Sequence, residues 1–210
     1  MKIISINQAE PRTITYRGRE VSTGIYKQPA TGRVQVNKLG LADDVQVDKR
    51  FHGGPDQALY AIDHSYYEYW QSELDRQDFE FGQFGENLTV VGMRDDEVYI
   101  GDTYRIGEIT VQVTHPREPC FKLGVKMDDA SFVKQFHEYG HVGFYLRVMQ
   151  PGSVEAGDSI ALEDRADDPM TVADVFRVMH LEKEDLIGAK KAAYLPNLTM
   201  AWREKLLGRL

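Results

Sequence analysis

The sequence has a single cysteine among its 210 residues, Cys120, so no disulfide can form within the chain. Such sparse cysteine usage is typical of proteins in a reducing compartment. No apolar run approaches the roughly 20 residues that a membrane-spanning helix requires. Residues 1–8 also lack the long apolar segment of a signal peptide. These absences predict a soluble, cytoplasmic protein with no membrane partner.

Positive charge is also scarce in this chain. The 25 Lys and Arg residues against 33 Asp and Glu give a formal net charge of −8. A general nucleic-acid-binding protein shows a basic balance or a basic stripe, so the composition argues against a nucleic-acid polymer as partner. The length accommodates one full domain, with room for a small appendage.

Short β-branched and apolar segments separated by glycine turns dominate residues 1–164. Their spacing predicts a closed or sandwich-like β domain rather than alternating βαβ units. Two helices interrupt the pattern: one follows Asp63 and carries an aromatic face, and the other covers residues 132–139 and ends at Gly140. The predicted strands lie at residues 1–8, 12–16, 20–26, 34–36, 45–48, 98–100, 103–106, 109–113, 142–149 and 159–162 and at the end of the segment 81–91.

The composition changes at residues 163–169, a charged segment that contains Pro169. Three short amphipathic helices are predicted beyond it, from Thr171 to Met179, over residues 182–193 and over residues 198–207. We therefore predict a β domain over residues 1–164 and a C-terminal three-helix unit over residues 170–210. Because the unit is too small for a large core of its own, we expect it to pack on the β domain or on a partner chain.

Cys120 lies in an unusual setting for a cysteine. Arg117 precedes it by three residues and Lys122 follows it by two, just after a strand that Pro116 and Pro119 must end or kink. Nearby cationic groups favour the thiolate, which is the nucleophilic and metal-binding form of the side chain. The alternative is a small apolar residue that fills a gap in the core.

Two glycine-containing segments could bind an anion. Gly53 and Gly54 permit close approach of backbone N–H groups, while Arg50 and His52 add side-chain donors. Glycine and proline together also form ordinary turns. Asn87 follows Gly85 in a second such segment, where the asparagine could instead satisfy the hydrogen bonds of its own turn.

The segment His137-Glu-Tyr-Gly-His141 matches the H-E-x-x-H pattern of zinc metalloproteases. Zinc binding requires both histidines on one face of a continuous helix. Gly140 is placed where that helix should end, and a strand-like segment follows at once. The pattern therefore lacks its structural context, and we do not favour a zinc site.

Several segments together resemble the MOSC domain family, named for the molybdenum cofactor sulfurase C-terminal domain. The similarity covers nearly the whole of residues 1–164, and residues after Thr171 resemble the three-helix extension found in one branch of the family. The segments are Arg50-Phe-His-Gly-Gly-Pro-Asp-Gln-Ala-Leu-Tyr60, Phe84-Gly-Glu-Asn-Leu-Thr89, Ile100-Gly-Asp102, Pro116-Arg-Glu-Pro-Cys-Phe-Lys-Leu123 and Gly143-Phe-Tyr-Leu-Arg-Val148.

The resemblance implies a mainly β fold with helices (α+β), in which a β-barrel carries inserted helices and a small C-terminal three-helix unit. It also implies a molybdenum cofactor of the molybdopterin type, with Cys120 as catalytic residue and molybdenum ligand. The residues that it implies for cofactor binding are Arg50, His52, Gly53, Gly54, Asn87, Arg117 and Lys122. Soft thiolate ligands and cationic phosphate donors agree with this assignment. The resemblance also implies a link to a pyridoxal-phosphate-binding domain family.

The activity implied by the resemblance is reduction of N-hydroxylated compounds, such as hydroxylaminopurine-type base analogues and hydroxylamines, to amines. This would be a detoxification role. No flavin, haem or iron–sulfur motif is visible in the sequence, so we expect a separate, flavin-dependent reductase to supply electrons to an enzyme acting on a small molecule. A homodimer is allowed. Two alternatives stay open: a carrier that holds sulfur as a persulfide on Cys120, and a cofactor-binding module without turnover.

Overall fold

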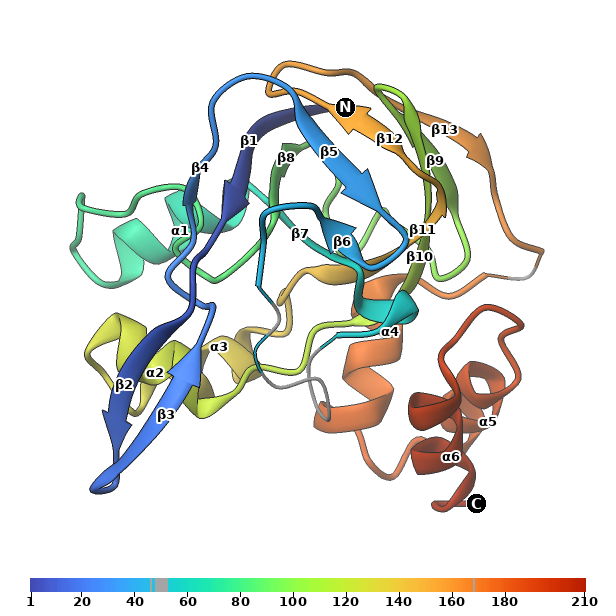
Figure 1. Ribbon diagram of the computed structural model, residues 1–210. Helices are drawn as coiled ribbons and strands as arrows, with labels where there is room; N and C mark the ends of the chain where they lie inside the picture. The colour runs from blue at the N-terminus through green and yellow to red at the C-terminus, as the bar shows by residue number, and fades with distance from the viewer. Residues whose placement is uncertain (46, 48–52, 168) are drawn as a thin grey trace.

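The computed structural model describes residues 1–45, 47, 53–167 and 169–210. One large curved sheet forms its body (Figure 1), and all of its strand pairs are antiparallel except the β7–β8 pair. In spatial order the strands are β13 (Ile160–Asp164), β9 (Thr103–Ile106), β10 (Ile109–Pro116), β11 (Phe144–Gln150), β7 (Leu59–Asp63), β8 (Leu88–Val91), β1 (Lys2–Gln8) and β4 (Gln28–Pro29).

The sheet curls until the segment leading into β13 meets the start of β1. The backbone N–H of Ile3 donates to Asp158 O at 3.0 Å, and Gly157 N–H donates to Ile3 O at 2.9 Å. Lys2 and Ser159 form an antiparallel bridge at the same place. These bonds satisfy backbone groups that an open sheet edge would leave unpaired, so the strands form a barrel-like body.

Two smaller sheets complete the β structure. Strands β12 (Gly152–Val154), β5 (Val34–Asn37) and β6 (Gly40–Leu41) form one of them. Strands β2 (Arg12–Tyr16) and β3 (Arg19–Thr23) form a hairpin that extends from the body (Figure 1). Its two turn residues, Arg17 and Gly18, both have positive φ, as the tight turn of a two-residue hairpin requires.

Helices cover the barrel where aromatic side chains need burial. Helix α1 (Ser65–Glu73) buries Tyr66, Tyr67 and Trp70, and the Trp70 ring packs on Phe132 and Phe136 of α3 (Phe132–Tyr139) at centroid distances of 4.8 and 5.8 Å. The 3₁₀ helix Pro55–Gln57 and helix α2 (Phe121–Met127) complete this part of the chain. The aromatic face predicted after Asp63 is therefore core packing.

The C-terminal part contains α4 (Val172–Phe176), a π-helical turn (Arg177–Leu181), α5 (Leu186–Ala193) and α6 (Met200–Leu207). Thr171 caps α4 by accepting from Asp174 N–H at 3.0 Å, which confirms the predicted start of the helix. The buried side chains of these helices belong to the same hydrophobic core as those of the barrel. The expected packing of this part on the β domain is thus present. Among the described residues, every helix falls short of the length and hydrophobicity that a membrane span needs.

The structure confirms the predicted α+β fold class and corrects several elements. The segment 98–100 is not a strand, since only Tyr99 pairs there, in an isolated bridge with Thr171. Val45 and Val47 also lie outside any strand, and the other two residues of that predicted strand lie outside the described residues. Helix α1 connects the parallel strands β7 and β8, so one βαβ unit is present after all.

Candidate functional site

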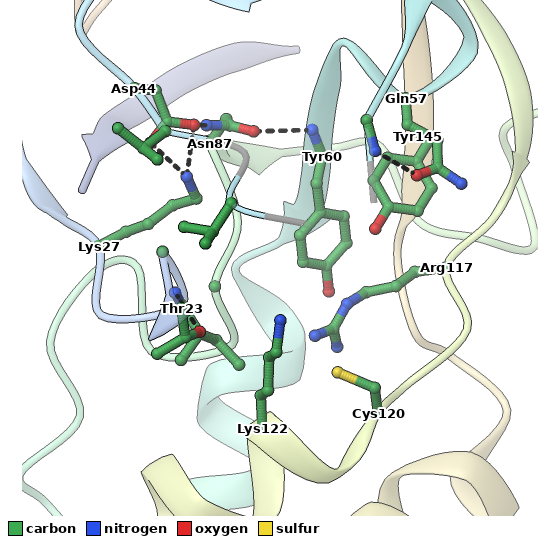
Figure 2. A pocket seen from close by; sticks show the side chains of 16 residues that line it. Thr23, Lys27, Asp44, Gln57, Tyr60, Asn87, Arg117, Cys120, Lys122 and Tyr145 are labelled. Atoms are coloured by element: carbon green, nitrogen blue, oxygen red, sulfur yellow. Dashed lines mark hydrogen bonds and ion pairs between the residues drawn. The ribbon is translucent and has the colours of Figure 1, made fainter. Parts of the chain in front are cut away.

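A pocket of about 110 Å³ opens where the segment after β10 meets the start of β7 and the loops around β3 and β6 (Figure 2). Its lining comes from segments that are far apart in the sequence. The lining residues are Thr23, Gly24, Ile25, Lys27, Asp44, Val45, Val47, Gly53, Gln57, Tyr60, Gly85, Asn87, Arg117, Cys120, Lys122 and Tyr145.

The segment around Cys120 forms one wall of this pocket. Strand β10 ends at Pro116, as the proline predicts, and the next residue donates its backbone N–H to Gly143 O at 3.0 Å. Helix α2 starts directly after Cys120, so Cys120 and Lys122 are held by the first turn of a helix that sequence analysis did not predict. Cys120 is half-buried, and its sulfur points towards Arg117 and Lys122 in Figure 2.

Arg117 is the most strongly buried cation of the site, with only 5% of its surface exposed. Its guanidinium carbon lies 4.8 Å from the centroid of the Tyr60 ring. Its Nη1 atom is buried and has no hydrogen-bond partner among the residues that the structure describes. Burial disfavours the charged form, but interactions with Tyr60, Tyr145 and Cys120 outweigh it, so the pKa of Arg117 is raised. Arg117 therefore carries a permanent positive charge and one N–H donor that no described residue engages.

Two lysines add to the positive character of the pocket. Lys122 is 9% exposed and lies on the same side as Arg117 (Figure 2). Lys27 lies on the opposite wall, where its ammonium group contacts the Asp44 carboxylate at 2.5 Å. Burial lowers the pKa of Lys27, and the Asp44 carboxylate opposes this change. The negative charge of Asp44 balances that of Lys27, so the net positive charge of the pocket lies near Cys120, at Arg117 and Lys122.

Asn87 lines the pocket, but its side chain is already engaged with the protein. Its Oδ1 accepts from the backbone N–H of Tyr60 at 3.1 Å, while its Nδ2 donates to Asp44 at 2.8 Å and to Asn7 O at 3.3 Å. Both amide hydrogens therefore have protein acceptors. This geometry favours a role in which Asn87 holds Tyr60 and Asp44 in place.

The predicted anion-binding loop is only partly described. Gly53 lines the pocket, and its N–H donates to the Gln57 side chain at 2.9 Å. Gly54 precedes the 3₁₀ helix with φ 84° and is not among the lining residues. Arg50 and His52 lie outside the described residues, so their roles stay predictions.

The two histidines of the zinc-like pattern have different surroundings. Gly140 ends α3 in the left-handed conformation with φ 79°, as predicted. The His137 ring packs on Phe176 and His180, whereas His141 Nδ1 lies 3.4 Å from the Tyr66 hydroxyl. The two rings therefore do not share one face of a continuous helix, which the metalloprotease arrangement requires.

Sequence analysis did not identify four of the charged or aromatic residues that shape the pocket: Lys27, Asp44, Tyr60 and Tyr145. Tyr60 and Tyr145 are paired across strands β7 and β11, with ring centroids 5.6 Å apart. Burial raises the pKa of both tyrosines, so both stay neutral at physiological pH. The tyrosines lie within segments noted for the resemblance, Tyr60 at the end of one and Tyr145 inside another. Lys27 and Asp44 have no such local signal.

The chemistry of the lining matches an anionic ligand that bears a soft metal. A thiol, a buried guanidinium with an unused donor and an ammonium group converge on one space, which is the donor set for a phosphate-bearing cofactor with a thiolate-bound metal. The aromatic faces of Tyr60 and Tyr145 supply an apolar wall beside this charge. The described residues therefore fit the cofactor that the sequence led us to expect.

Comparison with known proteins identifies the family. The model of the MOSC domain matches residues 48–161. Protein YiiM of Escherichia coli is 37% identical over 148 residues, 70% of this chain and 66% of that protein. A reductase of Gibberella moniliformis is 31% identical over 182 residues, which are 85% of this chain but only 32% of that longer protein.

A solved structure supports the assignment over the full length. The crystal structure of YiiM from Geobacillus stearothermophilus superposes with a TM-score of 0.85 at 34% identity, covering 100% of this chain and 98% of that one. The match includes the C-terminal helices as well as the barrel. The chain belongs to the MOSC domain family and is YiiM-like.

Proposed function

We propose that this protein is an oxidoreductase that uses a molybdenum-bearing pterin cofactor to reduce N-hydroxylated compounds to amines. The observation that carries the proposal is the convergence of Cys120, Arg117 and Lys122 in one pocket, where Arg117 Nη1 has no partner among the described residues. A buried donor of this kind costs stability unless a ligand accepts its hydrogen bond.

Each residue has a stated task in this proposal. Cys120 supplies a thiolate to the metal, and Arg117 and Lys122 bind anionic groups of the cofactor through charge-assisted hydrogen bonds. Tyr60 orients Arg117, because its ring lies under the guanidinium and its hydroxyl is anchored to Val142 O at 2.8 Å. Asn87 fixes the backbone of Tyr60. The bound cofactor would supply two-electron chemistry that removes the oxygen atom from the N–OH group.

The overall reaction takes up two electrons and two protons: the N–O bond breaks, an N–H bond forms, and the oxygen leaves as water. The chain itself shows no flavin, haem or iron–sulfur motif. A separate reductase, which we take to be flavin-dependent, supplies the electrons. The similarity to a protein named a reductase, most of which lies outside the match, supports a redox role for this module.

The test begins with the wild-type protein purified from a host that makes the cofactor. Elemental analysis and pterin fluorescence should show molybdenum and pterin in similar amounts. Turnover of 6-hydroxylaminopurine with chemically reduced methyl viologen as donor should give the amine. A protein that holds no molybdenum but shows a persulfide mass shift on Cys120 would instead be a sulfur carrier. Bound cofactor without turnover would indicate a binding module.

The other expectations concern the role of the activity, the location of the protein, its assembly and a family link. A detoxification role rests on the same turnover experiment. Cytoplasmic location, a homodimer and the link to a pyridoxal-phosphate-binding domain family stay predictions.

A further inference from the structure

A network of hydrogen bonds runs from the pocket wall at Gly53 into the interior of the barrel. The Gly53 N–H donates to Gln57 Oε1 at 2.9 Å, and Gln57 Nε2 lies 3.3 Å from His115 Nε2. His115 Nδ1 in turn lies 3.1 Å from Thr114 Oγ1. Gly53 and Gln57 line the pocket, whereas His115 on β10 does not and is only 3% exposed. The network therefore joins two pocket residues to a buried histidine.

The pocket end of this network fixes the orientation of the Gln57 amide. A backbone N–H can only donate, so Gly53 must face the oxygen of the amide. The amide nitrogen then faces His115, and because that nitrogen is also only a donor, His115 Nε2 must accept. Figure 2 shows the resulting arrangement, with the Gln57 oxygen towards the pocket and the nitrogen on the far side. The Gly53 end thus requires a neutral His115 whose hydrogen is on Nδ1.

The other end of the network requires the same form of His115. The Thr114 hydroxyl has one hydrogen, and two backbone carbonyls compete for it, Asp56 O at 2.7 Å and Tyr145 O at 3.1 Å. Because its hydrogen is engaged there, Thr114 Oγ1 can only accept from the ring, and His115 Nδ1 must donate. Burial lowers the pKa of His115 to about 3, so the ring is neutral. Both ends of the network select one tautomer, with the hydrogen on Nδ1.

The fixed amide gives the pocket two chemically different walls. Near Cys120, Arg117 and Lys122 are positively charged donors. At Gln57 a ligand meets an oxygen, whose partial negative charge repels an anion and attracts an N–H group, whatever else the side chain contacts. An amide turned the other way would present N–H donors to the ligand instead. The orientation of the Gln57 amide therefore decides which part of a ligand can lie beside it.

We propose that His115 is a positioning residue of the pocket, which holds the Gln57 amide with its oxygen towards the ligand. The N–H edge of a nitrogen heterocycle then lies at Gln57, and its anionic group lies at Arg117 and Lys122. This rests on the proposed function, because it states how the pterin of the cofactor is oriented in the pocket. His115 acts through Gln57 and is not itself part of the lining.

NMR of the protein with ¹⁵N-labelled histidine measures the tautomer directly. Long-range ¹H–¹⁵N spectra of the wild type at neutral pH should show a protonated Nδ1 and an unprotonated Nε2 for His115, whose signals are assigned by their absence from His115→Gln. In Gln57→Glu the carboxylate still accepts from Gly53 but cannot donate, so His115 Nε2 should acquire a proton. A histidine that only fills space would keep the same form in both proteins.

Equilibrium titration with the purified pterin cofactor, followed by fluorescence, measures the effect on the ligand. Gln57→Leu removes the oxygen and should weaken the affinity about three- to tenfold, as expected for one neutral hydrogen bond. His115→Leu should weaken it by a similar factor, although His115 lies outside the pocket. Because the two residues act as one unit, the double variant should lose no more than the larger single loss.

Two further variants serve as controls in the same titration. His115→Gln keeps an acceptor for the Gln57 amide and should recover most of the affinity that His115→Leu loses. His141→Leu removes a half-buried histidine that does not line the pocket, and it should bind the cofactor like the wild type. Circular dichroism shows beforehand that each variant is folded.

Four results would contradict the proposal while leaving the proposed function intact. These are a wild-type His115 protonated on Nε2, an unchanged tautomer in Gln57→Glu, wild-type affinity in Gln57→Leu, and additive losses in the double variant. Absence of pterin binding by the wild type would overturn the proposed function and, with it, the orientation of the ligand. The NMR experiment needs no cofactor, so it would still decide whether His115 orients Gln57.

Discussion

Replacing Cys120 with serine changes its size little but removes a soft, readily ionised ligand. We expect Cys120→Ser to lose viologen-driven turnover while it retains much of its pterin, because the anion contacts come from Arg117 and Lys122. Since Cys120 is only half-buried, the melting temperature should change little. Activity, pterin fluorescence and thermal melting measure the three effects. Turnover at the wild-type rate would exclude Cys120 as a metal ligand.

Arg117 tests the anion contact separately from the metal. A hydrogen bond to a charged group contributes about 1.5–3 kcal/mol, so Arg117→Ala should weaken pterin affinity about 10- to 100-fold. Arg117→Lys retains the charge but loses the planar fork, and we expect an intermediate loss. Equilibrium titration with the pterin cofactor measures both, after circular dichroism has shown that each variant is folded. Equal affinity in all three proteins would contradict the assignment.

The local sequence around Cys120 was sufficient to predict part of the site. Arg117, Cys120 and Lys122 are near neighbours in the chain, and their residue types alone indicated anion and metal chemistry. Lys27 and Asp44 were not predicted, because only the folded loops bring them to the same pocket. The amide of Asn87 is hydrogen-bonded to Tyr60 and Asp44, and its predicted contact with the cofactor stays a prediction.

The segment that follows α3 is held by a buried carboxylate. Asp95 Oδ2 accepts from the N–H groups of Val142 and Gly143, both at 2.9 Å. The carbonyls of the same two residues accept from the Tyr60 hydroxyl at 2.8 Å and from Arg117 N–H at 3.0 Å. Asp95 therefore stabilises the backbone that positions two pocket residues.

Asp95 should also make stability depend on pH. Burial raises its pKa to about 7, although the N–H groups of Gly143 and Val142 oppose this. An unfolded aspartate has a pKa of about 3.9, so the folded protein retains the proton between these values. The contribution of Asp95 to the free energy of unfolding then decreases as pH rises through this window, by at most about 1.4 kcal/mol per unit.

Urea unfolding of the wild type and Asp95→Asn at several pH values between 4.5 and 7.5 checks this prediction. The asparagine does not titrate, so the free energy of unfolding of the wild type should decrease relative to that of the variant as pH rises. Titration of all other groups is common to both proteins and cancels in the difference. Parallel pH profiles would show that Asp95 does not titrate in this range.

Two contacts of helix α6, the Trp202 ring and the Lys205–Glu118 ion pair, should differ greatly in their contribution to stability. Trp202 is 3% exposed and packs on His115 and His180. Trp202→Ala should lower the free energy of unfolding by about 3–5 kcal/mol because it leaves a cavity. Glu118→Gln removes the partner of Lys205 at an exposed position, where such pairs contribute at most about 1 kcal/mol. Chemical denaturation of both variants measures the contrast, and comparable losses would contradict it.

At the scale of the whole molecule, turn residues and hydrophobic spacing were enough to predict most strands, α3 and the C-terminal helices. The way the sheet closes was harder to predict. It depends on backbone hydrogen bonds between residues about 155 positions apart, such as those of Ile3 with Gly157 and Asp158. Helix α2 was not predicted, since the two prolines before Cys120 dominated the pattern there. The segment 98–100 has the composition of a strand, but only its middle residue finds a pairing partner.

The C-terminal helices should be inseparable from the barrel. Val172, Val175, Phe176 and Leu206 are fully buried in the common core, so deletion of all residues after Pro169 would expose the barrel surface that they cover. We expect the truncated protein to aggregate, as measured by light scattering during gel filtration. The deletion also removes the exposed apolar side chains of the C-terminal helices, such as Ile187, so the aggregation must come from the uncovered barrel. Full-length Ile187→Asp is the control, because it alters only an exposed side chain and should stay as soluble as the wild type. A truncated protein that keeps its solubility, its assembly state and its viologen-driven kinetics would show that the barrel does not need this cover.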